Sequence, residues 1–581
     1  MLYMVAWILA GLLLFVWVEP AEAQQAERPV FSPLGEATRD YNFGSLARLP
    51  DGRLFTWWAV GKRWMNQEDI DDPTIPQRAM CRWSDDDGRT WSEPELLFEF
   101  PRETGERLDG LTMVDSEGVL RIFGMNHFLL NTETMAPEDQ DRDIWQSVSR
   151  DMGQTWSPCE DIDFGHSTIG WLNNVIELSS GRFLLPLAYL SARETGKFVA
   201  TCIYSDDRGE SWELSRSDLV VDSGRGSLES GACEPVVIEM EPGQIWMLIR
   251  TQTGYFYEAF SDDGGETWSE PVQSRFKTTN SPAGLFKLSD GRILLMWDNC
   301  TFGNLEDFRG DRPVIAAAIS DDNGATWHGY REIARAVQSW ALAYPFAAET
   351  DRGDVITYLQ FGSHRLPPLD PDWLMETSVE DDLSEGMELW SVAGAEGVGI
   401  EELPEATGGH VLAMRKTSSE REAATSRNFP FGVRGRVELR MRVAEGCRGA
   451  SIVLTDVFSL PPFDRSGSFR VEVREDGGLY AVQPNGASAR AAEVPTDEWF
   501  TLGLQWDCQR HRCSVTLNGE EVCRLWQLLA PDLAKYPPNM ADGRAVAYAP
   551  GICYLRLRLS AEDTDQAGLM VDTFRADVSG G

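Results

Sequence analysis

Two groups of side chains in this sequence are of types that suit acid–base chemistry. The segment NQEDIDDPTIPQ clusters four carboxylates, and repulsion within such a cluster can raise the pKa of one member until it serves as a general acid. They are Glu68, Asp69, Asp71 and Asp72. The cluster is equally compatible with a solvated acidic loop. The sequence has only six histidines. Three of them lie on apparent loops between strands, and a hydrolase or lyase that uses histidine instead of these carboxylates would use these three: His127, His166 and His364.

The net charge limits which partners the chain can bind. With 92 Asp and Glu against 52 Lys and Arg, the formal charge is −40. Nucleic acid and anionic membrane surfaces need a basic footprint, so we predict no nucleic-acid partner. An anionic substrate is also repelled at long range, and a site for one must gather arginines locally.

The N-terminus has the pattern of an export signal. Residues 4–18 form one apolar run, and the sequence AEA at 21–23 fits signal-peptidase cleavage. We therefore expect a signal peptide at 1–23 and a secreted or periplasmic protein without membrane contact after cleavage. No Lys or Arg precedes the run, so an uncleaved anchor is the alternative.

Whether any of the ten cysteines form disulfides depends on this expectation of export. Export permits disulfides, and Cys508 and Cys513, which flank a polar four-residue turn, are the best candidate pair. No spacing of Cys and His in the sequence resembles a zinc site.

One octapeptide recurs five times and carries the fold prediction. The copies are SDDDGRTW from Ser84, SRDMGQTW from Ser149, SDDRGESW from Ser205, SDDGGETW from Ser261 and SDDNGATW from Ser320. Their start-to-start spacings of 65, 56, 56 and 59 residues indicate an array of similar units. In each copy the Asp can accept backbone N–H bonds, the Gly can adopt positive φ and the Trp can pack beneath the turn. Each copy is therefore predicted to lock a hairpin.

A second repeat lies between these locks and completes the architecture. It consists of two apolar runs around a Gly-containing turn, as in SLARLPDGRLFTWW, and occurs six times. Six inner hairpins and five outer locks predict six four-stranded blades in a ring, the last blade taking a strand from the other terminus. An acidic segment at 376–390 is predicted to be a linker. Alternating runs with Asn-Gly and Gly-Gly turns then predict an antiparallel sandwich at 391–581.

The fold class is thus all-β, a six-bladed β-propeller followed by a β-sandwich of the jelly-roll type. The octapeptide matches the Asp-box, S-x-D-x-G-x-T-W, and over residues 30–375 the chain resembles the sialidase (neuraminidase) superfamily. In that family the box is structural, so it specifies fold rather than reaction. The sandwich resembles the concanavalin-type jelly roll of glycan-active enzymes by strand pattern alone. It is either structural or carbohydrate-binding.

The resemblance implies a site with a Tyr nucleophile and Arg clamps. EPVVIEMEPGQIWMLIR resembles the family's strand pair from Glu to the second Arg, which implies that Glu234 activates the Tyr and Arg250 holds a substrate carboxylate. AYPFAAETDRGDVITYL resembles the nucleophile strand and implies Tyr344, with Tyr358 as a less favoured substitute. Arg312 stands where a further clamp is expected, and Arg309 is the fallback. If these residues have no catalytic role, Glu234 and Arg250 would form an ion pair at the rim of a blade. Tyr344 would then pack at the start of a strand, and Arg312 would be a surface charge.

Two further positions of the family pattern are less well matched. The family places its general acid before the first Asp-box, which here implies Asp71 or Asp72. Its first Arg falls on Asn42, which cannot form a bidentate cationic clamp, and such a loss costs about 2 kcal/mol or more in a shielded site. Arg63 or Arg78 is the candidate to compensate. Otherwise the ligand is not an ordinary sialoside.

Three functions are compatible with these residues. The first is an exported exo-glycosidase that hydrolyses terminal sialic acid or a related acidic sugar from glycoconjugates, with retention, through a Tyr nucleophile. It needs no cofactor, because acid, nucleophile and clamps are all side chains. The second, favoured by Asn42, is a sialidase-like propeller that acts on another polysaccharide as a hydrolase or lyase. The third is a non-catalytic glycan-binding protein.

Overall fold

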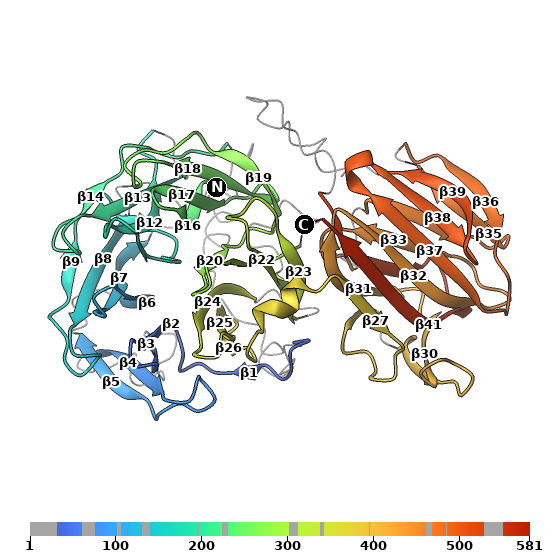
Figure 1. Cartoon of the computed structure of the whole chain (residues 1–581), viewed down its shortest axis with the longest axis horizontal. Helices are drawn as coiled ribbons and strands as arrows, with labels where there is room; N and C mark the ends of the chain where they lie inside the picture. The colour runs from blue at the N-terminus through green and yellow to red at the C-terminus, as the bar shows by residue number, and fades with distance from the viewer. Residues whose placement is uncertain are drawn as a thin grey trace, which may run out of the picture.

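The chain folds into two bodies of β-sheet that lie side by side, a ring and a sandwich (Figure 1). The computed structural model describes residues 32–60, 76–100, 106–130, 137, 140–193, 197–222, 230–300, 312–336, 342–393, 396–460, 467–483, 485–527 and 550–580. The segment expected to be a signal peptide, 1–23, lies outside these ranges. None of the described residues forms an apolar helix of membrane-spanning length.

The ring is a six-bladed propeller, as predicted, and each blade is an antiparallel sheet whose first strands lie toward the centre. The first two blades contain β2 (Ser45–Arg48), β3 (Leu54–Val60), β4 (Gln77–Ser84) and β5 (Glu95–Phe100), then β6 (Glu106–Val114), β7 (Leu120–Leu130), β8 (Gln140–Ser149) and β9 (Glu160–Ile162). The third contains β10 (Thr168–Ile169), β11 (Ile176–Glu177), β12 (Phe183–Leu190), β13 (Lys197–Ser205) and β14 (Glu213–Leu214), with β15 (Ser230–Gly231) parallel to β13.

The remaining blades follow the same order. The fourth contains β16 (Cys233–Glu241), β17 (Gln244–Arg250), β18 (Tyr255–Ser261) and β19 (Val272–Lys277). The fifth contains β20 (Gly284–Lys287), β21 (Ile293–Trp297), β22 (Val314–Ser320) and β23 (His328–Arg335). The sixth contains β24 (Ala343–Glu349), β25 (Val355–Phe361) and β26 (His364–Arg365), and the short 3₁₀ helix η4 (Pro371–Met375) follows it.

The sixth blade is closed by a strand from the N-terminal side, which confirms the prediction. β1 (Thr38–Arg39) pairs with β26, Thr38 opposite Arg365. The hydroxyl of Tyr358 on β25 donates to the backbone oxygen of Asp40 at 3.2 Å, across 318 residues of sequence. Closure of this kind covers a sheet edge that would otherwise be open to pairing with other chains.

Each octapeptide forms the predicted lock between the third and fourth strands of its blade. In the copy at Ser261, the Asp263 carboxylate accepts from the backbone N–H of Thr267 and from the Ser261 hydroxyl, both at 2.9 Å. Gly265 has a φ of 87°, and Trp268 is buried. A further regularity appears only in the structure, since the residue ahead of each Gly is also left-handed. These residues are Asp87, Met152, Arg208, Gly264 and Asn323.

A second repeated contact joins neighbouring blades. A serine in the inner hairpin turn of one blade donates its N–H and its hydroxyl to a Glu near the end of the next blade's inner strand, at 2.5 to 2.9 Å. The pairs are Ser116–Glu177, Ser179–Glu239 and Ser289–Glu349. These carboxylates therefore fix the spacing between blades at the rim where the inner strands end.

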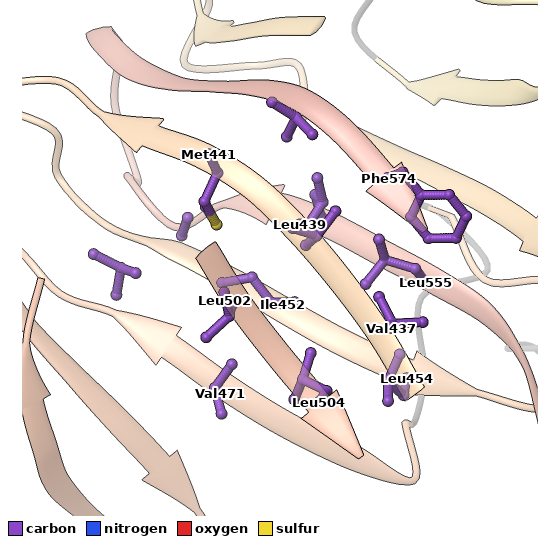
Figure 2. Packing of buried hydrophobic residues seen from close by; sticks show 14 of the residues in the cluster. Val437, Leu439, Met441, Ile452, Leu454, Val471, Leu502, Leu504, Leu555 and Phe574 are labelled. Atoms are coloured by element: carbon purple, nitrogen blue, oxygen red, sulfur yellow. The ribbon is translucent and has the colours of Figure 1, made fainter. Parts of the chain in front are cut away.

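The second body is the predicted sandwich of two largely antiparallel sheets. One contains β29 (Val398–Glu402), β30 (His410–Lys416), β41 (Asp565–Ser579), β32 (Arg434–Val443), β37 (Phe500–Asp507), β38 (Arg512–Leu517) and β39 (Glu520–Trp526), with β27 (Ser378–Asp381) also on β41. The other contains β28 (Trp390–Ala393), β31 (Ala424–Gly432), β40 (Ile552–Leu559), β33 (Ala450–Thr455), β34 (Phe469–Val473), β35 (Gly478–Val482) and β36 (Ser488–Glu493). Alternate residues of both sheets, such as Leu439 and Leu454, fill the core between them (Figure 2).

Two predictions about the sandwich are wrong. The segment 376–390 is not a free linker, because its strand β27 pairs with β41. Its acidic composition hid a strand with only partly buried side chains. Cys508 and Cys513 are free thiols. Cys508 begins the 3₁₀ turn η5 (Cys508–Arg510), and the cross-strand partner of Cys513 is Trp506, so the two cysteines do not face each other across the hairpin.

The sandwich docks on the fourth and fifth blades through buried polar and aromatic contacts. Lys277, the last residue of β19, forms a 2.8 Å ion pair with Asp456, and their side chains are 11% and 7% exposed. Phe431 stacks on Tyr330 with ring centroids 4.1 Å apart. Because a buried ion pair is costly to separate, this interface fixes the sandwich against the ring.

Candidate active site

The residues predicted to carry chemistry gather at the rim where the inner strands begin. Glu234 and Tyr344 are the second residues of β16 and β24. Arg250 ends β17, the hairpin partner of β16, and Arg312 stands two residues before β22. First and third strands of an antiparallel blade run in the same direction, so the Asp-boxes, which follow the third strands, lie at the opposite rim.

Glu234, Arg250 and Tyr344 form one hydrogen-bonded cluster. The Tyr344 hydroxyl lies 2.9 and 3.1 Å from the two carboxylate oxygens of Glu234. Nη1 of Arg250 pairs with the same carboxylate and donates to the Tyr344 hydroxyl at 3.2 Å. The side chains of Glu234 and Arg250 are 3% and 11% exposed, so little water screens their interaction.

The backbone at both Glu234 and Tyr344 is left-handed, with φ of 43° and 56°. Such a conformation costs a non-glycine residue about 1–3 kcal/mol and persists only where the surroundings enforce it. At Glu234 the register between β16 and β17 shifts, and a bulge of this kind can re-aim a side chain. Gly170 leaves room for the result, since a Cβ at that position would lie 2.7 Å from Cγ of Glu234.

Arg312 completes the group from a third blade. Its guanidinium carbon is 5.8 Å from the ring centroid of Tyr344 and 5.3 Å from that of Phe361. Asn280 positions both arginines, because its side-chain oxygen accepts from Nε of Arg250 at 2.8 Å and its backbone oxygen accepts from Nη2 of Arg312 at 2.8 Å. Asn280 was not among the residues predicted from the sequence. Its signal is its place, four residues before the inner strand β20.

Burial and the neighbouring charges shift the pKa values of the residues in this cluster. Burial and the facing carboxylate of Glu234 raise the pKa of Tyr344 despite the two arginines, so the resting phenol is neutral. Burial would lower the pKa of Arg250, but Glu234 and Tyr344 outweigh it and raise that pKa. Burial and repulsion by Arg250 lower the pKa of Arg312. Nε of Arg312 is buried without a hydrogen-bond partner among the described residues, which suits a cation that receives an anionic ligand.

Other predicted residues have different surroundings. Asn42 is exposed, and its N–H donates to Asp40 at 3.0 Å. Arg78 pairs with Glu99 at 3.2 Å across β4 and β5, so part of its charge is already matched, and its role as a compensating clamp stays a prediction. Tyr358 is buried and donates to Asp40, which removes it as a substitute nucleophile.

The remaining predicted residues divide into two groups. Asp71, Asp72 and Arg63 lie outside the described residues, as do Glu68, Asp69 and Arg309, so their roles stay predictions. Two of the histidines lie on strands instead of loops, His127 on β7 and His364 on β26. Burial lowers the pKa of His364 to about 4, and exposed His166 stacks on Tyr189. Within the described part of the chain, no three His, Cys, Asp or Glu side chains are grouped to hold a metal ion.

Comparison with known proteins points to one family. Residues 115–356 match the BNR repeat-like domain. Over 104 residues, 18% of this chain and 12% of the relative, the sequence is 35% identical to an anhydrosialidase of Macrobdella decora. Over 219 residues, 34% of this chain and 51% of the relative, it is 26% identical to a sialidase of Paraclostridium sordellii. The chain thus spans about half or less of the length of these curated relatives.

Solved structures of similar fold are more distant in sequence. The Hadza microbial sialidase Hz136 is 19% identical with a TM-score of 0.44, covering 57% of this chain and 66% of its own. The Trypanosoma rangeli sialidase in complex with the inhibitor DANA is 11% identical with a TM-score of 0.42, covering 93% and 92%. The five Asp-boxes, the BNR repeat-like match and the two curated relatives together show that the propeller of this chain is similar to proteins of the sialidase superfamily.

Proposed function

We propose that this protein is an exported exo-glycosidase that hydrolyses terminal sialic acid, or a related acidic sugar, from glycoconjugates with retention of configuration. The observation that carries the proposal is the Tyr344 hydroxyl, held 2.9 and 3.1 Å from both oxygens of Glu234 with Arg250 and Arg312 beside it. A phenol beside a carboxylate and two cations suits attack on an anionic sugar. The likeness to a sialidase and an anhydrosialidase supports the same class of substrate.

The chemistry follows from the roles of these side chains. Arg250 and Arg312 hold the substrate carboxylate through charge-assisted hydrogen bonds. Glu234 accepts the phenolic proton as the Tyr344 oxygen attacks the anomeric carbon, and a neutral nucleophile avoids repulsion by the substrate carboxylate. The predicted general acid, Asp71 or Asp72, protonates the leaving oxygen. The same Asp, now a carboxylate, takes a proton from the water that attacks the anomeric carbon, Glu234 returns its proton to the departing Tyr344 oxygen, and the two displacements retain the configuration.

The exposed Asn42 favours a second candidate function. A sialidase-like site with two arginines instead of three holds a carboxylate less tightly, by about 2 kcal/mol for one lost charge-assisted pair. A propeller with such a site would instead cleave another acidic polysaccharide, either by hydrolysis or as a lyase. Without turnover, the same site would make the protein a glycan-binding protein.

The first test is release of 4-methylumbelliferone from its α-N-acetylneuraminic acid conjugate by the purified protein. We expect turnover, and we expect Tyr344→Phe to lower kcat/KM by about 10³-fold or more because the nucleophile is lost. Tyr480→Phe, at a half-buried tyrosine of the sandwich, is the matched control and should retain full activity. Absence of turnover by the unaltered protein would exclude the simple sialidase, and uronate polymers would then be tested for cleavage.

Asn42→Arg separates the two candidate substrates. If the protein is a sialidase that lacks one arginine clamp, the added Arg should strengthen binding of the sialoside and lower its KM by about tenfold. An enzyme adapted to another acidic polysaccharide should gain nothing on the sialoside and lose activity on its own substrate.

A further inference from the structure

The sandwich carries a basic groove on the outer face of the sheet that contains β41, β32, β37, β38 and β39, the strands seen on the right of Figure 1. Its volume is about 590 Å³. Five arginines line it against three carboxylates: Arg434, Arg436, Arg510, Arg512 and Arg524 against Asp507, Glu521 and Asp577. The lining residues therefore carry two excess positive charges, although Arg436 also pairs with Glu438 beside the groove, on a chain whose formal charge is −40.

Strand register arranges the lining side chains in two rows across the sheet. Opposed residues of an antiparallel pair point to the same face, and so do residues two apart on one strand. The first row is Asp577, Arg436, Gln505, Ser514 and Arg524. The second row is Ser579, Arg434, Asp507, Arg512 and Trp526. Five adjacent strands span about 19 Å, enough for several sugar rings.

The second row ends on an exposed aromatic side chain. Trp526 is 60% exposed, more than any other large hydrophobic side chain among the described residues. It lies directly opposite Arg512, which forms no ion pair within the described part of the chain. A flat indole opposite a guanidinium offers an apolar surface and an anion-binding group to the same ligand.

We propose that this groove binds an acidic oligosaccharide, laid across the five strands, at a site separate from the propeller. Arginines bind its carboxylate or sulfate groups, and Gln505, Ser514 and the carboxylates bind its hydroxyls. Trp526, which lies beside the groove opposite Arg512, packs against the face of a sugar ring. Closely spaced phosphates fit less well, because three carboxylates lie among the arginines and the whole chain is negative. The proposal does not depend on the reaction of the propeller.

The test is calorimetric titration of the full chain with a chondroitin sulfate hexasaccharide. Arg436→Ala with Arg512→Ala should weaken binding at least tenfold, and Trp526→Ala about fivefold, while Tyr344→Phe should leave it unchanged. Both arginine side chains are exposed, so the variant is expected to fold. Arg490→Ala, on β36 of the other sheet, is the control for loss of an exposed arginine outside the groove and should bind as the unaltered protein does.

Three results would overturn the proposal. They are no binding of the hexasaccharide, equal binding of neutral cellohexaose, and binding that the double arginine variant leaves intact. A single-stranded oligonucleotide of equal charge provides the last comparison. Weak binding of it would support a glycan site, whereas equal or tighter binding through the same arginines would assign the groove to nucleic acid and contradict us. Oligogalacturonate, tested beside the hexasaccharide, distinguishes carboxylate from sulfate as the group that is bound.

Discussion

Both rims of the propeller hold carboxylates, and the partners of those carboxylates differ. At the Asp-box rim, Asp263 is exposed and accepts hydrogen bonds from Ser261 and Thr267 of its own octapeptide. At the other rim, Glu234 is buried, and its carboxylate binds Arg250 of the same blade, Tyr344 of another and the backbone N–H of Trp171 of a third. A local lock stabilises one turn, whereas a cluster from several blades exists only when the ring has formed. Substitutions at the first rim should therefore affect stability, and those at the second should affect activity.

The largest expected effect separates two glutamates on one strand. Glu234→Gln removes the base that faces Tyr344 and should lower kcat/KM on the 4-methylumbelliferyl sialoside by about 10²–10³-fold. Glu239, also on β16, binds Ser179 at the other rim, so Glu239→Gln should change kcat/KM less than about twofold. Equal losses in the two variants would contradict the division between the rims.

A second buried pair tests whether the cost of a buried charge is general in this molecule. Asp456→Ala leaves Lys277 buried without its carboxylate at the interface of propeller and sandwich, and should cost about 3–5 kcal/mol in urea unfolding. Adding Lys277→Met should restore most of that loss, because no charge then remains buried. A double variant as unstable as the single one would show that packing, not charge, accounts for the loss.

The Asp-box rim should respond more weakly. Asp263→Ala removes three hydrogen bonds and should lower the free energy of unfolding by about 1–2 kcal/mol, with kcat/KM unchanged. Asp262→Ala, at the exposed neighbouring residue, is the matched control and should stay within about 0.5 kcal/mol. Equilibrium urea unfolding measures both. If folded Asp263→Ala lost activity, the Asp-box rim would also contribute to activity, which would contradict the division between the two rims.

The smallest expected effect is a dependence of thermal stability on pH at one Asp-box. Hydrogen bonds from Thr155 lower the pKa of Asp151 to about 2, below its ordinary value of 3.8. Because the folded pKa is the lower one, the stabilisation is fully present above about pH 4 and is lost as the pH falls toward 2. Asp151→Asn should therefore lower Tm at pH 6, and its difference from the unaltered protein should shrink at pH 3. Scanning fluorimetry at both values checks this, and a constant difference would contradict it.

What repeats in this chain could be predicted from its sequence. The octapeptides and the inner hairpins recur at a regular period, so one interpretation explains many residues, and blades, locks and ring closure were all predicted from them. The site occurs once. Glu234, Arg250 and Tyr344 were found only by resemblance, and the contacts among them depend on the bulge at Cys233 and on left-handed backbone, which no local pattern encodes.

The missed features share a physical origin. Asn280 acts partly through a backbone oxygen, which any residue type possesses, so its identity says little about its role. The basic groove arises from cross-strand register, which aligns residues from five strands that are far apart in the chain. The failed disulfide prediction rested on the hairpin expected around the turn between Cys508 and Cys513, but the strand register pairs Cys513 with Trp506 instead.

Closure of the sixth blade by β1 bears on how the chain matures during synthesis. The closing strand leaves the ribosome early, whereas Tyr358, which binds the backbone at Asp40, follows 318 residues later. At about 5–20 residues per second, β1 waits for about 15–60 s before its partner strands exist. During that interval the edge it will cover is absent, and β1 itself can pair with another nascent chain. Crowded polysomes should thus favour ring-swapped dimers, with the β1 of one chain closing the propeller of the next.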